Sequence, residues 1–177
     1  MPDPHPPVNV IIRPEAPADF VAVAEINTLA FGASGEAQLV AALRQLPGTI
    51  SLVADRLGQP VGHICFSSAV ITGAETDTPV IALAPMAVLP EVQGMGIGSR
   101  LVEAGLAACR RAGHRLVVVL GHPWFYPRFG FVPAAPYGIH YPQPVPEEVF
   151  MLLELVPDAA KDISGTVRYP SAFSLVD

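Results

Sequence analysis

MAVLPEVQGMGIGSRL, residues 86–101, joins the end of an apolar strand to a glycine-rich loop that opens directly into a helix. Glycines let a loop backbone come close to a ligand. The unpaired N–H groups of a helix's first turn point at that ligand with the positive end of the helix dipole. The stretch therefore predicts an anion site, and a phosphate is the expected ligand.

Two common nucleotide-binding motifs do not match this loop. A P-loop needs Gly-Lys-Ser/Thr, and the loop has no lysine. A Rossmann motif that begins with Gly94 and Gly96 requires a third glycine at position 99, where this sequence has Ser99. The next strand, 116–120, is followed by Gly-His, whereas the motif requires an acidic residue that binds ribose. An ordinary strand-to-helix turn is the structural alternative, but three alternating glycines exceed what such a turn requires.

A third pattern fits, Val-x-Pro-x-x-Gln-x-x-Gly-x-Gly, and its residues are Val88, Pro90, Gln93, Gly96 and Gly98. It resembles the acyl-CoA loop of the GNAT (Gcn5-related) N-acetyltransferase family. A second match, YPRFGF at 126–131, resembles the Tyr-x-x-x-Gly-Phe that ends the family's cofactor half. The longer stretch 121–131 is similar to a bacterial branch of predicted N-acetyltransferases, and the resemblance is sharpest over residues 80–133.

The fold class expected from these patterns is α/β. Apolar periodicity and turn residues predict the order strand, two helices, three strands, helix, strand, short helix, strand. The GNAT resemblance implies that family's acyl-CoA N-acyltransferase fold, a mixed central sheet flanked by helices, with the cofactor between two splayed strands. The expected strands of this order are 8–13, 50–55, 60–70, 80–88, 116–120 and 148–155, and the expected helices are 16–31, one from residue 34 to about 46, and 97–112. The chain is expected to finish with a strand and turn at 165–170. Residues 133–146 are rich in proline and are expected to form an extended loop.

Composition predicts one domain over residues 8–177 after a flexible proline-rich arm, 1–7. The chain has 177 residues, 51% of them hydrophobic and 15% charged. It has no membrane-length apolar run and no leader pattern, so we expect a cytoplasmic protein without a membrane partner. A net charge of −6 with scattered basic residues argues against nucleic acid. Cys65 and Cys109 are expected as buried thiols, and the histidines lack metal-ligand spacing.

The GNAT resemblance implies a reaction in which an amine attacks the thioester of acetyl-CoA. It places the pantetheine arm along the strand end and the pyrophosphate on backbone N–H groups of residues 94–99, with Arg100 as a further phosphate contact. The expected cofactor-binding residues are Met86, Ala87, Val88, Gln93, Gly94, Met95, Gly96, Ile97, Gly98, Ser99 and Tyr126. The acceptor is expected to be a small-molecule or protein amine.

Tyr126 occupies the family's general-acid position. A phenol has an ordinary pKa of about 10, so it is protonated at neutral pH and can donate to a leaving thiolate. The alternative interpretation is a tyrosine that simply belongs to an aromatic core. The general base stays open between a water chain and four side chains, which are Glu25, Glu36, His122 and His140. His122, which lies beside the aromatic segment, is the second expected catalytic residue. Residues 119–123 lack the asparagine with which many family members bind pantetheine, and His122 or a main-chain group is expected to replace that contact.

Three functions are therefore compared. The leading one is an N-acetyltransferase that works by direct attack in a ternary complex. The alternatives are a non-catalytic acyl-CoA-binding module, which would bind without turnover, and a longer-chain acyltransferase, for which longer acyl-CoAs would compete. The acceptor pocket is expected between the first two helices, the 133–146 loop and the C-terminal strand, and a homodimer is an option taken from the family alone.

Overall fold

The computed structural model describes residues 8–176, which fall into two compact units. Unit 1 comprises residues 8–66, 85–105 and 172–176, and unit 2 comprises 67–84 and 106–171. Three elements pass from one unit into the other along the chain: β3 (Gln59–Thr72), β4 (Asp77–Val88) and α3 (Ile97–Arg111). The expected arm 1–7 lies outside the described residues, and one domain over 8–177 stays a prediction.

Unit 1 is an antiparallel sheet with helices on both faces. Its other elements are β1 (Ile11–Pro14), α1 (Phe20–Phe31), α2 (Gly35–Leu43), β2 (Ile50–Arg56) and three 3-10 helices, η1 (Pro17–Asp19), η2 (Pro90–Val92) and η6 (Ser171–Val176). Ile11 pairs with Asp55 and Ile50 pairs with Phe66, so β1, β2 and β3 form a meander. The N–H of Leu89 donates to the Val61 carbonyl at 2.9 Å, which places the end of β4 beside β3.

Local signals explain where these elements begin and end. The N–H of Ala16 donates to the Asp19 carboxylate at 2.8 Å ahead of α1, and Gly32 ends that helix with a φ of 75°. Leu57 (φ 54°) and Gly58 (φ 85°) are the two left-handed residues of the tight turn between β2 and β3. The sequence interpretation of both helices and of the hairpin is therefore confirmed.

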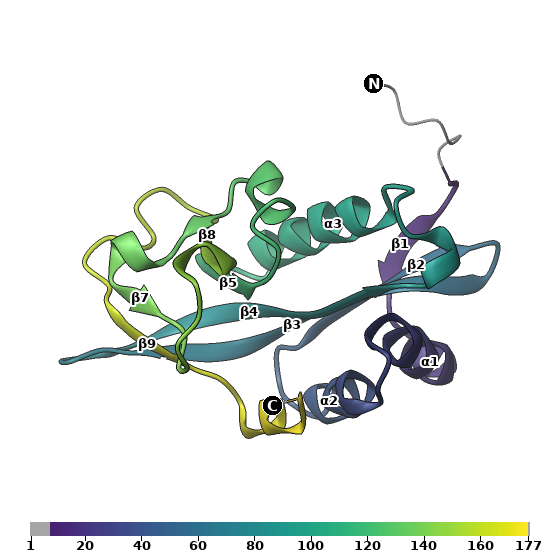
Figure 1. Ribbon diagram of the computed structural model, residues 1–177, viewed down its shortest axis with the longest axis horizontal. Coiled ribbons are helices and arrows are strands. Elements are labelled where there is room, and N and C mark those ends of the chain that lie inside the picture. Colours follow the sequence, from purple (N-terminus) through teal and green to yellow (C-terminus); the bar gives the residue numbers. More distant parts are fainter. Residues whose placement is uncertain (1–7, 177) are drawn as a thin grey trace. The chain divides into compact units, whose positions relative to one another are not determined.

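The two faces of unit 1 carry different helices, as Figure 1 shows. Helices α1 and α2 cover one face, where the buried clusters consist of Val23, Val40 and Val53, and of Leu39, Leu43 and Cys65. On the other face α3 packs closely on β3. A Cβ built on Gly62 would lie 3.1 Å from Ile97 and from Leu101, and one built on Gly105 would overlap the Phe66 ring. These glycines let strand and helix approach.

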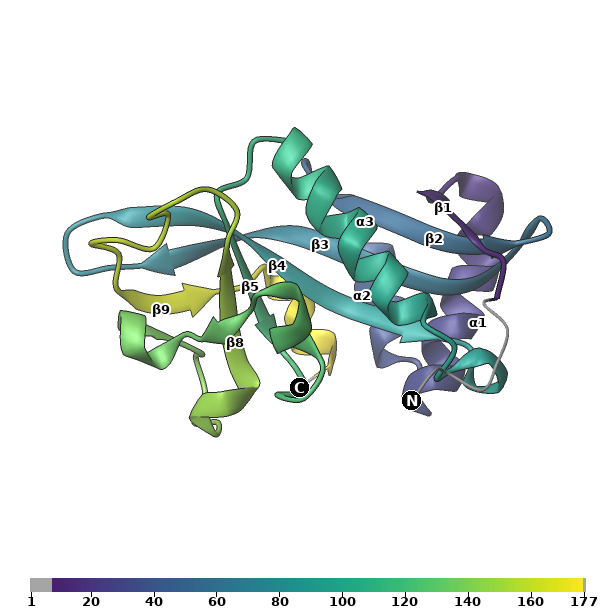
Figure 2. The ribbon, with the colours of Figure 1, turned by 90° about the horizontal axis from the view of Figure 1, so that it is seen from above.

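Unit 2 is a mixed sheet. Its further elements are β5 (Leu116–Leu120), β6 (Val132–Pro133), β7 (Ile139–His140), β8 (Phe150–Glu154), β9 (Gly165–Arg168) and three 3-10 helices, η3 (Tyr126–Phe129), η4 (Ala135–Tyr137) and η5 (Glu147–Val149). Strand β5 runs parallel to β4 and antiparallel to β8. In Figure 2, β9 runs beside the C-terminal part of β3, where Ile71 pairs with Val167. Continuous apolar residues bury β5 on both faces, as its sequence predicts.

The expected extended loop at 133–146 needs a correction. It holds η4 and β7, and Gly138 (φ 73°) makes the turn between them. Ile139 is fully buried, and β7 pairs with β9 in parallel. Proline content predicted the loop, but the pairing partner lies far along the chain and local sequence could not reveal it.

Both cysteines are buried, as expected, and burial raises the pKa of each thiol to about 12. Such thiols are poor nucleophiles at neutral pH. Within residues 8–176, no helix combines the length and apolar character that crossing a bilayer requires.

Candidate functional site

The glycine loop of unit 1 lies between the end of β4 and the first turn of α3. Gly94 and Gly96 have φ angles of 75° and 80°, which L-residues rarely adopt. A Cβ built on either glycine would meet no atom within 4 Å. Glycine is therefore required at these two positions by the left-handed backbone conformation. Contact with neighbouring protein atoms does not require it. The space above the loop is open to a ligand.

Helix α3 presents its first turn at the end of this loop. Its first hydrogen bond runs from the Arg100 N–H to the Gly96 carbonyl at 3.2 Å. The N–H groups of Ile97 and Gly98 precede that bond, so they have no partner within the helix. Ile97 is 1% exposed and anchors the helix start to the core. Peptide dipoles and unpaired N–H groups together form a site suited to an anion.

The side chain of Gln93 forms a hydrogen bond within the loop itself. Its side-chain amide donates to the carbonyl of Val88 at 2.9 Å and so ties the loop back to the end of β4. Gln93 is exposed, while Met86 and Val88 are half-buried and Ala87 is buried. The amide holds the shape of the loop, and its contact with a cofactor stays a prediction.

The parallel ladder between β4 and β5 is short. Its three pairs join Ile81 to Val117, Ala82 to Val118 and Leu83 to Val119. Among residues 8–176, no strand pairs with this edge of β4 after Leu83, although β4 continues to Val88. Pro85, which has no N–H, lies in the unpaired part. Backbone groups along this edge are therefore available to an extended ligand.

Tyr126 belongs to unit 2 and is 6% exposed. Its ring packs edge-to-face on Phe125 and Phe131, at centroid distances of 5.0 and 5.6 Å. A Cβ on Gly121 would lie 2.3 Å from the tyrosine ring, so only glycine fits there. The interpretation of the Tyr126 ring as a member of an aromatic core is thus confirmed, and its role as general acid stays a prediction.

The hydroxyl of Tyr126 is suited to donate a proton. Burial raises the pKa of Tyr126 to about 12, so the phenol stays protonated well above neutral pH. Within the described part of the chain, the hydroxyl of Tyr126 has no hydrogen-bond partner. Its oxygen is not among the unpaired side-chain atoms that are completely buried, so it keeps some exposure to solvent. A ligand could therefore take its proton without competition from a protein acceptor.

His122 lies on the turn between β5 and η3, and its ring stacks on Trp124 at 5.0 Å. The other three candidate bases are spread over the chain. Glu25 is exposed on α1, Glu36 is half-buried on α2 and His140 is exposed on β7. The structure singles out none of the four as the base. Among residues 8–176, no three His, Cys, Asp or Glu side chains gather as metal ligands would.

Comparison with known proteins gives consistent matches. The sequence model of the Acetyltransferase (GNAT) domain matches residues 47–133. The Escherichia coli K12 protein named uncharacterized N-acetyltransferase YjhQ is 46% identical over 136 residues, which cover 74% of this chain and 75% of that protein. The chain belongs to the GNAT acetyltransferase family. This membership also makes it an acyltransferase by class and agrees with the resemblance read from its two motifs.

Two crystal structures share the fold of this GNAT protein. One is the GNAT family N-acetyltransferase YhbS from Escherichia coli in complex with CoA, with a TM-score of 0.86, 32% identity, and coverage of 96% of this chain and 94% of that one. The other is a GNAT family acetyltransferase from Brucella melitensis in complex with acetyl-CoA, with a TM-score of 0.76, 36% identity, and coverage of 94% and 99%. The predicted fold class is thereby confirmed.

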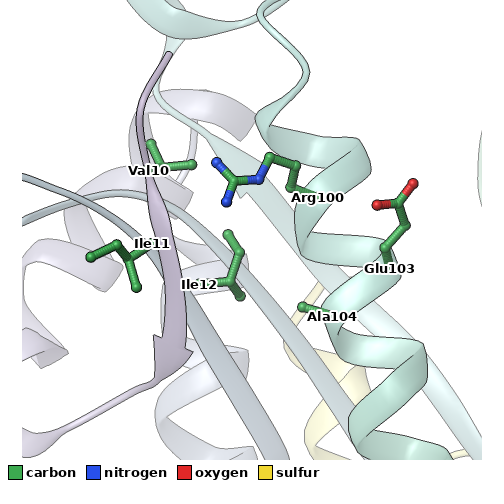
Figure 3. Close-up of a pocket in the computed structure, with 6 residues that line it drawn as sticks. All are labelled: Val10, Ile11, Ile12, Arg100, Glu103 and Ala104. Atoms are coloured by element: carbon green, nitrogen blue, oxygen red, sulfur yellow. The ribbon is translucent and has the colours of Figure 1, made fainter. Parts of the chain in front are cut away.

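Arg100 reaches away from α3 toward β1. There it borders an open pocket of about 440 Å³ whose lining residues are Val10, Ile11, Ile12, Arg100, Glu103 and Ala104. Figure 3 shows the guanidinium of Arg100 directed at β1, whereas the carboxylate of Glu103 points away from it. Contact of Arg100 with a cofactor phosphate stays a prediction, and in this GNAT protein its side chain lines a surface between β1 and α3.

Sequence reasoning missed a buried polar network in unit 1 of this GNAT protein. Arg44 donates from Nε to both carboxylate oxygens of Glu15 at 3.1 Å, and the Ser51 hydroxyl donates to the same carboxylate at 2.7 Å. Ser51 Oγ lies 2.8 Å from His63 Nε2, and Asn27 Nδ2 lies 3.3 Å from His63 Nδ1. We call these five residues the His63 network.

The network defines the tautomer of His63. Because Ser51 uses its one proton on Glu15, its oxygen must accept from the His63 Nε2–H. His63 Nδ1 then accepts from the Asn27 amide, and the imidazole is neutral. Burial lowers the pKa of His63 to about 4, which agrees with this assignment. No local signal could have predicted the network, because Asn27 and His63 are 36 positions apart.

Proposed function

We propose that this protein is an N-acetyltransferase that moves the acetyl group of acetyl-CoA to a primary amine of a small molecule or a protein. The observation that carries the proposal is the open, left-handed glycine loop ahead of α3. Membership of the GNAT family supports the same reaction class. Attack is proposed to be direct, with both substrates bound together, since both cysteines are buried with raised thiol pKa values.

The residues of the loop and of β4 fit an acyl-CoA. Backbone N–H groups of residues 94–99 would hold the pyrophosphate, and the unpaired edge of β4 at Met86, Ala87 and Val88 would bind the pantetheine amides as a further strand would. The CoA and acetyl-CoA complexes of the two structural relatives support this choice of co-substrate. When bound, acetyl-CoA supplies an activated thioester carbonyl.

Proton transfer completes the proposed reaction. A C–N bond forms between the amine and the acetyl carbon, and the C–S bond breaks. Tyr126 would give its hydroxyl proton to the departing thiolate, because burial keeps this phenol protonated. The proton lost by the amine would go to His122, to another of the four candidate groups or to a water chain. The proposed location of the enzyme is the cytoplasm, and a homodimer is one option for its assembly.

The first test is calorimetric titration of the purified protein with acetyl-CoA, with desulfo-CoA and NADH as comparisons. We expect CoA-selective binding in the micromolar range, about −8 kcal/mol. A thiol-release assay with a panel of primary amines then measures transfer. Absence of acetyl-CoA binding would overturn the proposal, and tight binding without turnover of any amine would favour a non-catalytic acyl-CoA-binding module. Competition by longer acyl-CoAs would indicate a longer-chain acyltransferase.

A further inference from the structure

Strand β1 lies at one end of the sheet, and among residues 8–176 no strand pairs with its outer edge. The register shows which backbone groups point outward there. The N–H of Glu15 donates to the Ser51 carbonyl at 3.0 Å, so these residues form a hydrogen-bonded antiparallel pair. Such pairs alternate along the strands with pairs that are not hydrogen-bonded. The N–H and the carbonyl of Ile12, three positions earlier, therefore point away from β2 and are available to an additional strand.

The outer edge of β1 lacks the charged side chain that commonly protects such an edge. Arg13 is the charged residue of β1, and it is held by ion pairs with Asp19 and Asp55 at 2.7 and 2.9 Å. The edge is also short, because β1 has four residues and ends at Pro14. Two backbone hydrogen bonds at Ile12 contribute less free energy than the association of two molecules costs. Side-chain contacts must therefore supply most of the affinity of any added strand.

A pocket beside this edge can supply such contacts. It has a volume of about 440 Å³, lies between β1 and α3, and is lined in part by the apolar residues Val10, Ile12 and Ala104. Figure 3 shows the side chains of Val10 and Ile12 directed toward α3, whereas the side chain of Ile11 points to the other side of β1. The pocket is therefore suited to apolar side chains of an added strand. We call the outer edge of β1 and this pocket the β1–α3 groove.

Arg100 gives the β1–α3 groove a positive charge. Its guanidinium is directed at β1 in Figure 3, and the Glu103 carboxylate points away from it. In the described part of the chain, the Arg100 guanidinium forms no ion pair. An arginine side chain is always charged and binds carboxylates through parallel N–H groups. The groove is therefore complementary in charge to a carboxylate.

Strand geometry determines which residue of an added strand meets Arg100. Two residues that lie directly opposite each other in an antiparallel pair have their side chains on the same face of the sheet. A residue that pairs with Ile12 from the outer side therefore directs its side chain to the face where Arg100 lies. The residues two positions before and after it share that face, on which the Val10 side chain also lies. The groove thus fits an acidic residue with an apolar residue two positions away.

We propose that the β1–α3 groove binds an extended acidic segment of a partner protein. The segment adds to β1 as a short antiparallel strand, exchanges two backbone hydrogen bonds with Ile12 and places its carboxylate on Arg100. This binding needs neither acetyl-CoA nor turnover, so it is independent of the proposed function. It gives the protein an interaction surface on the side of α3 that faces β1.

Fluorescence anisotropy with a labelled peptide tests this binding. The probe is fluorescein-Val-Thr-Glu-Thr-Val-amide, in which the glutamate and both valines share one face of an extended strand. The full chain should bind it at least about threefold more tightly than the same peptide with glutamine, as an exposed ion pair provides. A third peptide carries N-methylglutamate and so lacks the N–H that would donate to the Ile12 carbonyl. It should bind about fivefold more weakly than the first peptide.

Variants of the protein locate the contact. Arg100→Gln should bind the glutamate and glutamine peptides with affinities that agree within about 1.5-fold, because the ion pair is lost. Arg110→Gln removes an exposed charge from the last turn of the same helix, and it should keep the wild-type preference. Ile12→Pro removes the outward N–H and leaves the hydrogen bonds to β2, so it should weaken both peptides by about fivefold. Circular dichroism confirms that each variant is folded.

Three results would overturn the proposal. The first is the absence of saturable binding of the glutamate peptide up to about 1 mM. The second is equal affinity for the glutamate and glutamine peptides in the wild type, or a preference that Arg100→Gln leaves unchanged. The third is a wild type that sediments as a dimer and an Ile12→Pro variant that sediments as a monomer, because a second copy of the chain would then occupy the edge. All measurements are made without acetyl-CoA, so failure of the proposed function would not affect them.

Discussion

At the scale of single residues, Tyr126 and Gly121 form a pair that determines where the phenol lies. The tyrosine ring occupies the space that any side chain at position 121 would need. Phe125 and Phe131 hold the ring from its other sides. The hydroxyl alone is left for chemistry, and burial raises its pKa to about 12. Packing of the ring therefore determines the position of Tyr126, and the hydroxyl oxygen is the one atom of its side chain proposed to take part in the reaction.

Tyr126→Phe removes that atom and leaves the packing intact. We expect kcat to fall by about 10- to 1000-fold, because the general acid is lost, while the affinity for acetyl-CoA changes less than about twofold. Because the pKa of Tyr126 is raised, its ionisation should add no alkaline limb to the kcat profile below about pH 11. Initial rates measured across pH check the fall in kcat and the shape of its pH profile. Calorimetry with acetyl-CoA checks the affinity. The exposed Tyr137→Phe is the matched control, and a Tyr126→Phe enzyme with wild-type kcat would remove this residue from the mechanism.

Gly121→Ala tests the pair from the other side. The added methyl would lie 2.3 Å from the Tyr126 ring, so the ring or the turn must move. We expect a loss of about 1–3 kcal/mol in the free energy of unfolding, typical of overpacking, together with reduced kcat. Urea denaturation and initial rates measure the two effects. If Tyr126→Phe lowers kcat by the same factor in the Gly121→Ala background as in the wild type, the contact with Tyr126 is not the cause of the defect.

At the scale of elements, the loop between β4 and α3 combines a conformation that needs glycine with a helix start that favours anions. Gln93 braces it by donating to Val88, and Ile97 anchors it in the core. The sequence predicted this element almost completely, since every feature of it lies within sixteen consecutive residues, 86–101. Its openness above Gly94 and Gly96 could be seen only in the structure.

Gly96→Ala isolates the contribution of the loop to acyl-CoA binding. Gly58, in the hairpin turn, has a similar positive φ and equally open surroundings, so Gly58→Ala carries the same backbone strain at a remote turn. We expect each change to cost about 1 kcal/mol of stability. Only Gly96→Ala should weaken acetyl-CoA, by about tenfold or more in calorimetry, because its methyl occupies the ligand's approach. Equal affinities of the two variants would refute a role for the loop.

At the scale of the whole molecule, stability is expected to depend on pH through the His63 network. The pKa of His63 is about 4 in the folded protein and 6.5 in an exposed imidazole. The unfolded chain therefore binds a proton first as pH falls. The contribution of the neutral His63 to the free energy of unfolding is complete above pH 6.5. It is lost progressively as the pH falls from 6.5 to 4, and the total loss is up to about 3 kcal/mol. The Asp19 carboxyl, whose pKa is lowered chiefly by its hydrogen bonds from Arg13, acts at more acidic pH.

Urea unfolding of the wild type and of His63→Gln at several pH values between 4 and 7 checks this prediction. The variant should be less stable at pH 7, because Ser51 and Asn27 lose their partner, but its stability should change less over this pH range. NMR titration of the His63 imidazole in the folded wild type gives an independent measurement. An imidazole that titrates near pH 6.5 would contradict the neutral, buried assignment.

The sequence by itself determined the loop, the helices, the hairpin and the family, because each depends on residues that are close along the chain and on local backbone preferences. The tertiary structure alone decided where the β4–β5 ladder stops, how the residues around 139 pair with β9, and that Glu15, Asn27, Arg44, Ser51 and His63 share one network. Those features depend on contacts between distant segments. Such contacts form only when the chain is packed, and no periodicity or motif encodes them.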